Sequence, residues 1–216
     1  MFTTATMRTR VMFGKNRLLQ ILCGVYLVIW TIAAIRPLHP DDWLLENVLV
    51  FLFVPLIAFS HNHFPLSDLS YVTITLFMIL HAIGAHYTYA EVPFGFWIQE
   101  TFQLSRNHYD RLIHFSFGLL IAYPIREIFL RVADAKGFWA LYLPLDVTLA
   151  FSAMYEVIEW LAASVTNPEL GAAYRGLQGD QWDAQKDIAM AGLGALSCML
   201  LTALIRRMRK GRVLPP

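Results

Sequence analysis

The chain has 216 residues, of which 57% are hydrophobic and 15% are charged, and its mean hydropathy is +0.49. So few charged residues exclude an ordinary water-facing surface, and most of the surface must face lipid. The formal net charge is +1, which supplies no basic field for phosphates and excludes nucleic acid as a partner.

Six apolar stretches approach the roughly 20 residues that a helix needs to cross the hydrocarbon core of a bilayer. The first follows a basic N-terminal segment that lacks a small-residue cleavage site, so it is interpreted as a retained helix and not a signal peptide. The second is short and contains Pro55. The predicted spans are residues 18–35, 44–59, 69–90, 112–130, 138–163 and 188–205.

Lys and Arg in the short loops set the orientation, because positive charges are retained on the cytoplasmic side. With the N-terminus inside, 12 of the 17 Lys and Arg residues fall in cytoplasmic segments. The longer connections, residues 91–110 and 164–187, then lie outside, and the first is rich in aromatic residues, as is typical of headgroup level. The sequence predicts an all-α polytopic transmembrane helix bundle, residues 1–216, with about six spans and both termini cytoplasmic.

Ionisable side chains gather at the outer ends of the last three spans. At membrane depth each one needs a partner, a water-filled cavity or a function. Residues three or four apart share a helix face, so each group can point the same way. We expect Asp110, His114, Glu156 and at least one of Asp183 and Asp187 to approach one another, with the side-chain tips of His114, Glu156 and Asp183 or Asp187 within about 4 to 7 Å, the reach of one bridging water. The three groups of ionisable residues are Asp110 with His114, Glu156 with Glu159, and Asp180 with Asp183 and Asp187.

Other polar or small residues support more limited predictions. His81 and His86 point about 140° apart on the third span, which disfavours a shared ligand, and at least one should face protein. His61 and His63 are interpreted as part of a solvated inner turn. Small residues around Gly194 predict close packing of the last helix.

The acidic groups with the imidazole could bind a divalent cation, since oxygen ligands suit magnesium, calcium or manganese and histidine also admits zinc or iron. They could equally perform acid–base catalysis. Alternatively, nearby Arg and Lys residues simply neutralise the acids as ion pairs, or Asp183 and Asp187 serve as first-turn acids of the last helix. The candidate catalytic residues are Asp110, His114, Glu156, Glu159, Asp183 and Asp187, and the candidate metal ligands are His114, Glu156, Asp183 and Asp187.

Three motifs occur in order along the chain: RNHYDRLIHF at residues 106–115, EVIEW at 156–160 and QGDQWDAQKD at 178–187. Together they resemble the YjdF family of bacterial inner-membrane proteins. This resemblance covers nearly the whole chain. It implies a multi-pass protein of the bacterial inner membrane and adds no established activity.

A looser similarity is to VanZ-like proteins, which are associated with glycopeptide antibiotic tolerance. The chain differs from that pattern at Asp187, where an Asn is usual, and at Glu159, where a Gln is usual. These additional acids favour a cation or proton site. The matching residues are Asp110, Arg111, His114, Phe115, Glu156 and Asp183.

The leading hypothesis is a membrane-embedded site, open to the outer leaflet and periplasm, that acts on a lipid headgroup or another polar ligand. Membrane lipid is the expected partner, and the chemistry would be metal- or acid–base-assisted hydrolysis or transfer. Two alternatives stay open, a proton- or cation-coupled permease and a non-catalytic envelope scaffold.

Overall fold

The computed structural model describes residues 13–165 and 178–211, and all regular secondary structure within them is helical. The predicted all-α class is confirmed. Two short 3-10 helices are present, η1 (Phe13–Lys15) and η2 (Tyr89–Glu91). The α-helices are α1 (Arg17–Ala33), α2 (Pro40–His61), α3 (Asp68–Tyr87), α4 (Pro93–Thr101), α5 (Tyr109–Val132), α6 (Trp139–Val165) and α8 (Asp183–Gly211).

Each predicted span coincides with one long helix, but several helices begin earlier than the apolar stretches. Within the described ranges, five helices are long and apolar enough to cross a membrane (α2, α3, α5, α6 and α8), while α1 is a shorter apolar helix of 17 residues. α2 begins at Pro40 with two acids in its first turn, and α8 begins at Asp183. Proline and acids both suit the first turn of a helix, which explains the earlier starts.

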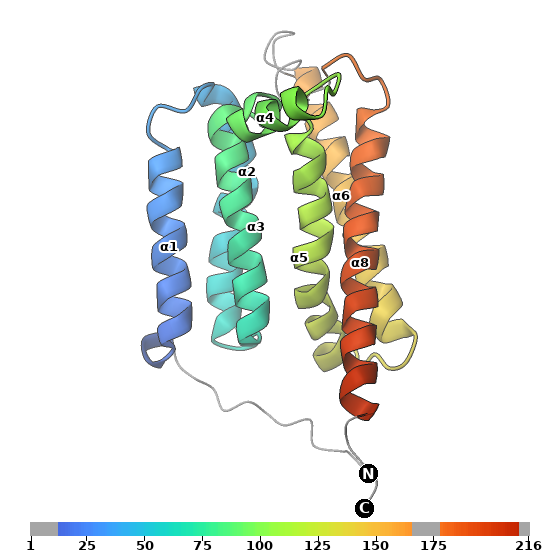
Figure 1. Cartoon of the computed structure of the whole chain (residues 1–216). Coiled ribbons are helices and arrows are strands. Elements are labelled where there is room, and N and C mark those ends of the chain that lie inside the picture. Colours follow the sequence, from blue (N-terminus) through green and yellow to red (C-terminus); the bar gives the residue numbers. More distant parts are fainter. Residues whose placement is uncertain (1–12, 166–177, 212–216) are drawn as a thin grey trace, which may run out of the picture.

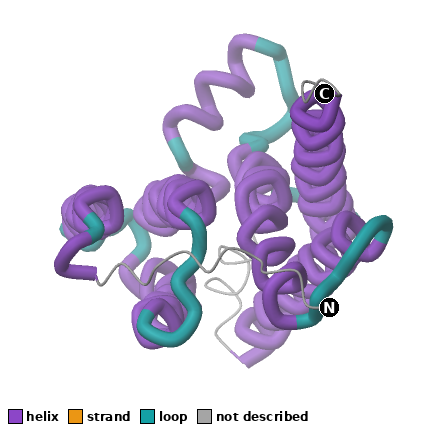
Figure 2. Tube along the Cα trace, turned by 90° about the horizontal axis from the view of Figure 1, so that it is seen from below, coloured by secondary structure: helices purple, strands orange, loops and turns teal. Residues whose placement is uncertain are grey.

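The long helices run side by side along one axis (Figures 1 and 2). α5 packs against α3, α6 and α8, whereas α1 and α2 pack against α3. The start of α1 and the end of α8 lie at the same end of the bundle, and α4 lies across the opposite end (Figure 1). We call this opposite end the α4 end. That it faces outward, with both termini cytoplasmic, stays a prediction.

The contact between α5 and α8 is backbone against backbone. A Cβ atom added to Gly118 would lie 1.9 Å from the carbonyl oxygen of Ala191, and one added to Gly194 would lie 2.0 Å from that of Phe115. Real Cβ atoms do not approach so closely, so glycine is required at both positions. The predicted close packing of the last helix is confirmed.

Gly194→Ala should therefore lower the stability of the protein by about 1–3 kcal/mol, because the new methyl group forces α5 and α8 apart. Thermal unfolding in detergent would measure the loss. Gly24→Ala in α1 is the matched control, since nothing lies within 4 Å of its Cβ position. An equally stable Gly194→Ala protein would contradict the tight α5–α8 contact.

The histidines of α3 face protein, as predicted. The hydroxyl of Tyr89 lies 2.5 Å from Nδ1 of His81, and Nδ1 of His86 lies 2.9 Å from the carbonyl oxygen of Ala33. The prediction of a solvated turn is wrong for His61, which is buried at the end of α2 with its Nδ1 2.6 Å from the hydroxyl of Tyr71. Tyr71 comes from α3, a partner that the local sequence does not reveal.

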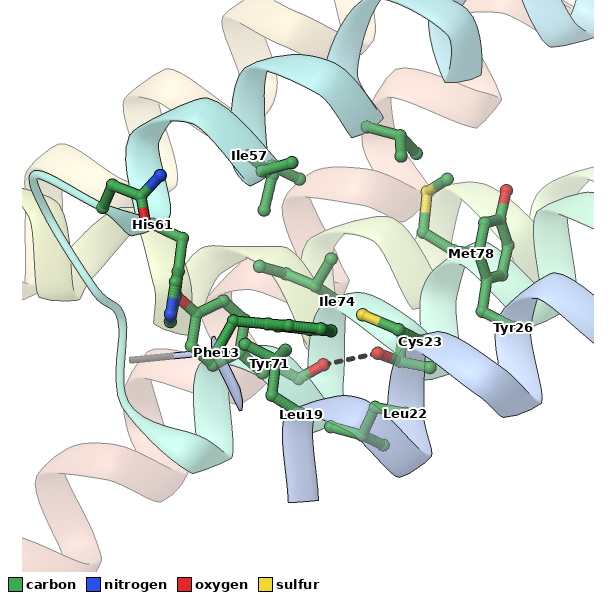
Figure 3. Close-up of a pocket in the computed structure, with 14 residues that line it drawn as sticks. Phe13, Leu19, Leu22, Cys23, Tyr26, Ile57, His61, Tyr71, Ile74 and Met78 are labelled. Atoms are coloured by element: carbon green, nitrogen blue, oxygen red, sulfur yellow. Dashed lines mark hydrogen bonds between the residues drawn. The ribbon is translucent and has the colours of Figure 1, made fainter. Parts of the chain in front are cut away.

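An apolar cavity of about 410 Å³ lies between α1, α2 and α3, at the end of the bundle away from α4 (Figure 3). Its polar edge contains His61 and Tyr71, and aliphatic side chains such as Ile57 and Ile74 line it. The cavity lies between α1 and α2 because α1 packs against α3 and not against α2. The cavity is separate from the acidic residues at the α4 end.

Candidate functional site

Asp110 and His114 occupy the first turns of α5. The helix begins at Tyr109, whose N–H donates to the side-chain oxygen of Asn107 at 3.0 Å. One helical turn separates the two site residues, and Nε2 of His114 lies 3.7 Å from Oδ1 of Asp110. On the other side of the ring, Nδ1 lies 3.2 Å from the hydroxyl of Ser152. The imidazole is therefore oriented by α5 and α6 together.

Helix α6 contributes two acids to the same place. Oε1 of Glu156 lies 3.3 Å from Nε2 of His114, so this nitrogen faces carboxyl groups from two helices. Glu159 is buried one turn further along α6 and contacts Glu156. The sequence-predicted pairs of α5 and α6 thus face each other across the helix interface.

The first turns of α8 complete the cluster. One oxygen from each of Asp110, Asp183 and Asp187 lies within 4.8 Å of the other two. Asp183 and Asp187 are each only 2% exposed. Three carboxylate oxygens at this spacing are a ligand set suited to magnesium, calcium or manganese. We call these three residues the carboxylate triad.

Several oxygens of the cluster lack a hydrogen-bond partner among the described residues. They are Oδ2 of Asp183, Oδ1 of Asp187 and Oε1 of Glu156, and all three are buried. Buried polar atoms without partners are costly, so they need a proton, a water molecule or a cation. The donor set therefore fits a bound cation.

Basic residues at the mouth of the site satisfy some of the acids. Arg106 and Arg111 both pair with Oδ1 of Asp183, and Arg111 also reaches Asp180 at 2.6 Å. Lys186 pairs with Asp180 at 2.6 Å. Lys186, the Trp182 N–H and Arg111 together hold the pKa of the Asp180 carboxyl below its usual range.

The alternative of simple ion pairing therefore explains part of the cluster. It accounts for Asp180, which lies at the rim, and for one oxygen of Asp183. Within the described part of the chain, no Lys or Arg lies within 4.0 Å of Asp110, Asp187 or Glu156. The structure thus brings all six predicted catalytic residues together, while their roles stay predictions.

Glu46 is not among the predicted site residues, although it lies in the same part of the bundle. It is buried in α2 and accepts hydrogen bonds from Tyr155 at 2.7 Å and from Tyr89 at 3.2 Å. Tyr155 also packs edge-on against His114, with ring centroids 6.0 Å apart. An acid inside the apolar stretch 44–59 is the sequence signal that could have identified it.

Below the cluster, towards the end away from α4, the interior contains an apolar group of side chains, with the buried Arg126 of α5 beside it. Ala122, Ala195, Cys198 and Met199 form a buried group there, directly beyond the backbone contact between α5 and α8. Among the described residues, the clustered acids of α5, α6 and α8 all lie at the α4 end. The acidic cluster is therefore separated from the other end of α5 and α8 by a close backbone contact and an apolar group.

Comparisons with known proteins agree with this picture of a membrane protein. A family model described as "Predicted membrane protein (DUF2238)" matches residues 18–208. The "Inner membrane protein YjdF" of Escherichia coli (strain K12) is 44% identical over 163 residues, which cover 74% of this chain and 77% of that protein. No solved structure matches. The similarity to VanZ-like proteins stays a prediction from the motif residues.

Proposed function

We propose that this chain, which belongs to the DUF2238 family of membrane proteins, binds a divalent cation at its carboxylate triad for hydrolysis or transfer at a lipid headgroup. The protein is a polytopic inner-membrane protein of the YjdF type. The observation that carries the proposal is the approach of three buried carboxylate oxygens from α5 and α8 to within 4.8 Å of one another.

Charge balance supports a cation at the triad. Among the residues that the structure describes, Asp183 is the one member of the triad with Arg partners within salt-bridge distance. Like charges so close together and shielded from water repel strongly unless a cation or a proton compensates them. When bound, a divalent cation would polarise a phosphoryl or carbonyl oxygen of the substrate. Asp110, Asp183 and Asp187 would hold it.

In this proposal, His114 acts as the general base. Its Nε2 faces Asp110 and Glu156, while Ser152 lies against its other nitrogen. A base held in one orientation beside acids can take a proton from an attacking water or hydroxyl group. Glu156 can accept that proton from the imidazole or stabilise the imidazolium that forms. His114 and Glu156 would thus supply acid–base catalysis next to the three proposed metal ligands.

The surroundings favour a lipid substrate. Helix α4 lies across this end of the bundle (Figure 1). Aromatic side chains of α4 and of the residue that follows it are exposed. Amphipathic aromatic residues concentrate at headgroup level, where a lipid headgroup would meet the site. A permease would need a polar route to the other side, and there the close contact of α5 with α8 and the apolar group beyond it favour a lipid substrate, while the buried Arg126 is the feature that a permease would use. The exposed aromatic residues are Phe94, Phe96, Trp97 and Phe102.

Purified protein in nanodiscs of bacterial polar lipids would test the proposal. We expect one Mn²⁺ per chain by electron paramagnetic resonance, and headgroup-modified lipid by mass spectrometry when Mg²⁺ or Mn²⁺ is present but not with EDTA. His114→Asn should abolish the modification and keep the protein folded. Glu100→Gln, on the exposed face of α4, is the control. A chain that binds no Mn²⁺ would refute the metal site.

A further inference from the structure

Glu46 belongs to a second polar group, formed by α2, α3 and η2 beside the carboxylate triad. Its Oε2 accepts from the hydroxyl of Tyr89 at 3.2 Å, and the same hydroxyl lies 2.5 Å from Nδ1 of His81. All three side chains are at least nine-tenths buried. They form a continuous hydrogen-bonded row, which we call the Glu46 row.

The hydroxyl of Tyr89 has one proton and two polar neighbours. If it donates to the Glu46 carboxylate, His81 must carry its proton on Nδ1 and donate it to the Tyr89 oxygen. If the Tyr89 hydroxyl donates to Nδ1 of His81, that nitrogen is an acceptor, so the proton of neutral His81 is on Nε2. Glu46 is then protonated and donates its acid proton to the Tyr89 oxygen. The two arrangements differ by one proton overall.

Nε2 of His81 is the open end of this row. It is buried and has no hydrogen bond of good geometry within the described ranges, although the backbone carbonyl of Glu46 lies near the imidazole. The ring of Phe77 stacks on the imidazole, with centroids 6.3 Å apart, and so holds its plane. A buried nitrogen without a partner needs an exchangeable proton or a water molecule beside it.

We propose that His81, Tyr89 and Glu46 form a proton-transfer chain that ends in a proton store on Glu46. A proton that binds Nε2 of His81 releases the proton of Nδ1 to the Tyr89 oxygen, and the Tyr89 proton passes to Oε2 of Glu46. One N–H bond forms and one breaks on His81, one O–H bond is exchanged on Tyr89, and one forms on Glu46. Neutral His81 is restored in its other tautomer.

Charged and polar groups on every neighbouring helix act on this chain. Asp42 of α2 and Asp110 of α5 repel a negative charge on Glu46, whereas Tyr155 of α6 donates to it. Around Tyr89 lie Asp110, Glu159 and Tyr109. Asp42, Asp110 and the Tyr155 hydroxyl thus all act on the end of the chain where the proton is stored.

Tyr155 connects the store to the carboxylate site, because its hydroxyl donates to Glu46 while its ring packs on His114. The chain lies beside the acid–base pair of His114 and Glu156, which it meets through this ring contact. It does not require the proposed metal. The test below uses metal-free protein, so that failure of the metal site and failure of the chain are distinguishable.

The test is a joint pH titration of His81 and Glu46 in EDTA-treated protein in nanodiscs. Nitrogen NMR of protein with ¹⁵N-labelled histidine reports the tautomer, and His81→Gln identifies the His81 signals. Infrared spectroscopy reports the protonated carboxyl of Glu46, identified by its loss in Glu46→Gln. As the pH falls, we expect His81 to change from the Nδ1–H to the Nε2–H tautomer at the midpoint where the Glu46 carboxyl band appears.

Two conservative variants separate a chain from a static network. Tyr89→Phe should leave the Glu46 band titrating but uncouple it from the His81 tautomer. Tyr155→Phe should keep the two transitions coupled and move both to higher pH, because the carboxylate loses a donor. A single His81 tautomer throughout, formation of the His81 imidazolium, or a tautomer change that persists in Glu46→Gln would overturn the proposal. If Tyr89→Phe or Tyr155→Phe fails to fold, the wild-type titration decides the case, with its signals assigned by His81→Gln and Glu46→Gln.

Discussion

Asp187→Asn is expected to weaken Mn²⁺ binding by about 100-fold or more. The substitution keeps the size of the side chain but removes one anionic ligand from the triad, and hard divalent cations depend on carboxylate charge for affinity. Asp187 is buried with one oxygen free of any hydrogen bond in the described part of the chain, so an amide there is tolerated sterically. Titration of nanodisc-embedded protein with Mn²⁺, followed by electron paramagnetic resonance, measures the affinity.

Asp134→Asn is the matched control for this experiment. It makes the same chemical change at a carboxylate whose side chain is 79% exposed, in the connection between α5 and α6, where Lys136 is its partner. Its Mn²⁺ affinity should equal that of the unmodified protein. Equal loss of binding in both variants would show that Mn²⁺ associates with the protein surface and not with the triad.

Arg106→Met is expected to destabilise the protein by about 3–5 kcal/mol. Arg106 is 5% exposed and pairs with Asp183, which is 2% exposed. Removing one partner of a buried ion pair leaves the other charge poorly compensated in a low-dielectric environment. Methionine fills a similar volume, so lost packing contributes little. Unfolding by denaturant in detergent micelles would measure the difference.

Lys136→Met provides the comparison, because it breaks an ion pair with Asp134 that is exposed on both sides. Exposed pairs contribute about 0–1 kcal/mol, so this variant should unfold almost like the unmodified protein. Combining Arg106→Met with Asp183→Asn should recover part of the loss. An Arg106→Met protein of normal stability would mean that Arg111 alone compensates the Asp183 charge or that Asp183 is uncharged in the folded state.

Local patterns in the sequence determined the membrane location, the helices and half of the site. Helical spans follow from runs of apolar residues, because backbone groups in lipid must be satisfied within the helix. Spacings of three and four place Asp110 with His114, and Glu156 with Glu159, on single helix faces. Since α5, α6 and α8 follow one another with their acids at the same ends, their meeting was also predictable from the order of the helices.

Only the tertiary structure decided which further groups join these acids. Glu46 meets Tyr155 across 109 residues of sequence, and Arg106 meets Asp183 across 77. Such contacts depend on how the helices rotate and on which helices are neighbours, and hydropathy carries neither kind of information. The wrong prediction for His61 has the same cause. Its local sequence suggests a solvated turn, but in the fold Tyr71 of α3 lies against it. Periodicity determines which face of a helix is polar, whereas packing determines what that face meets.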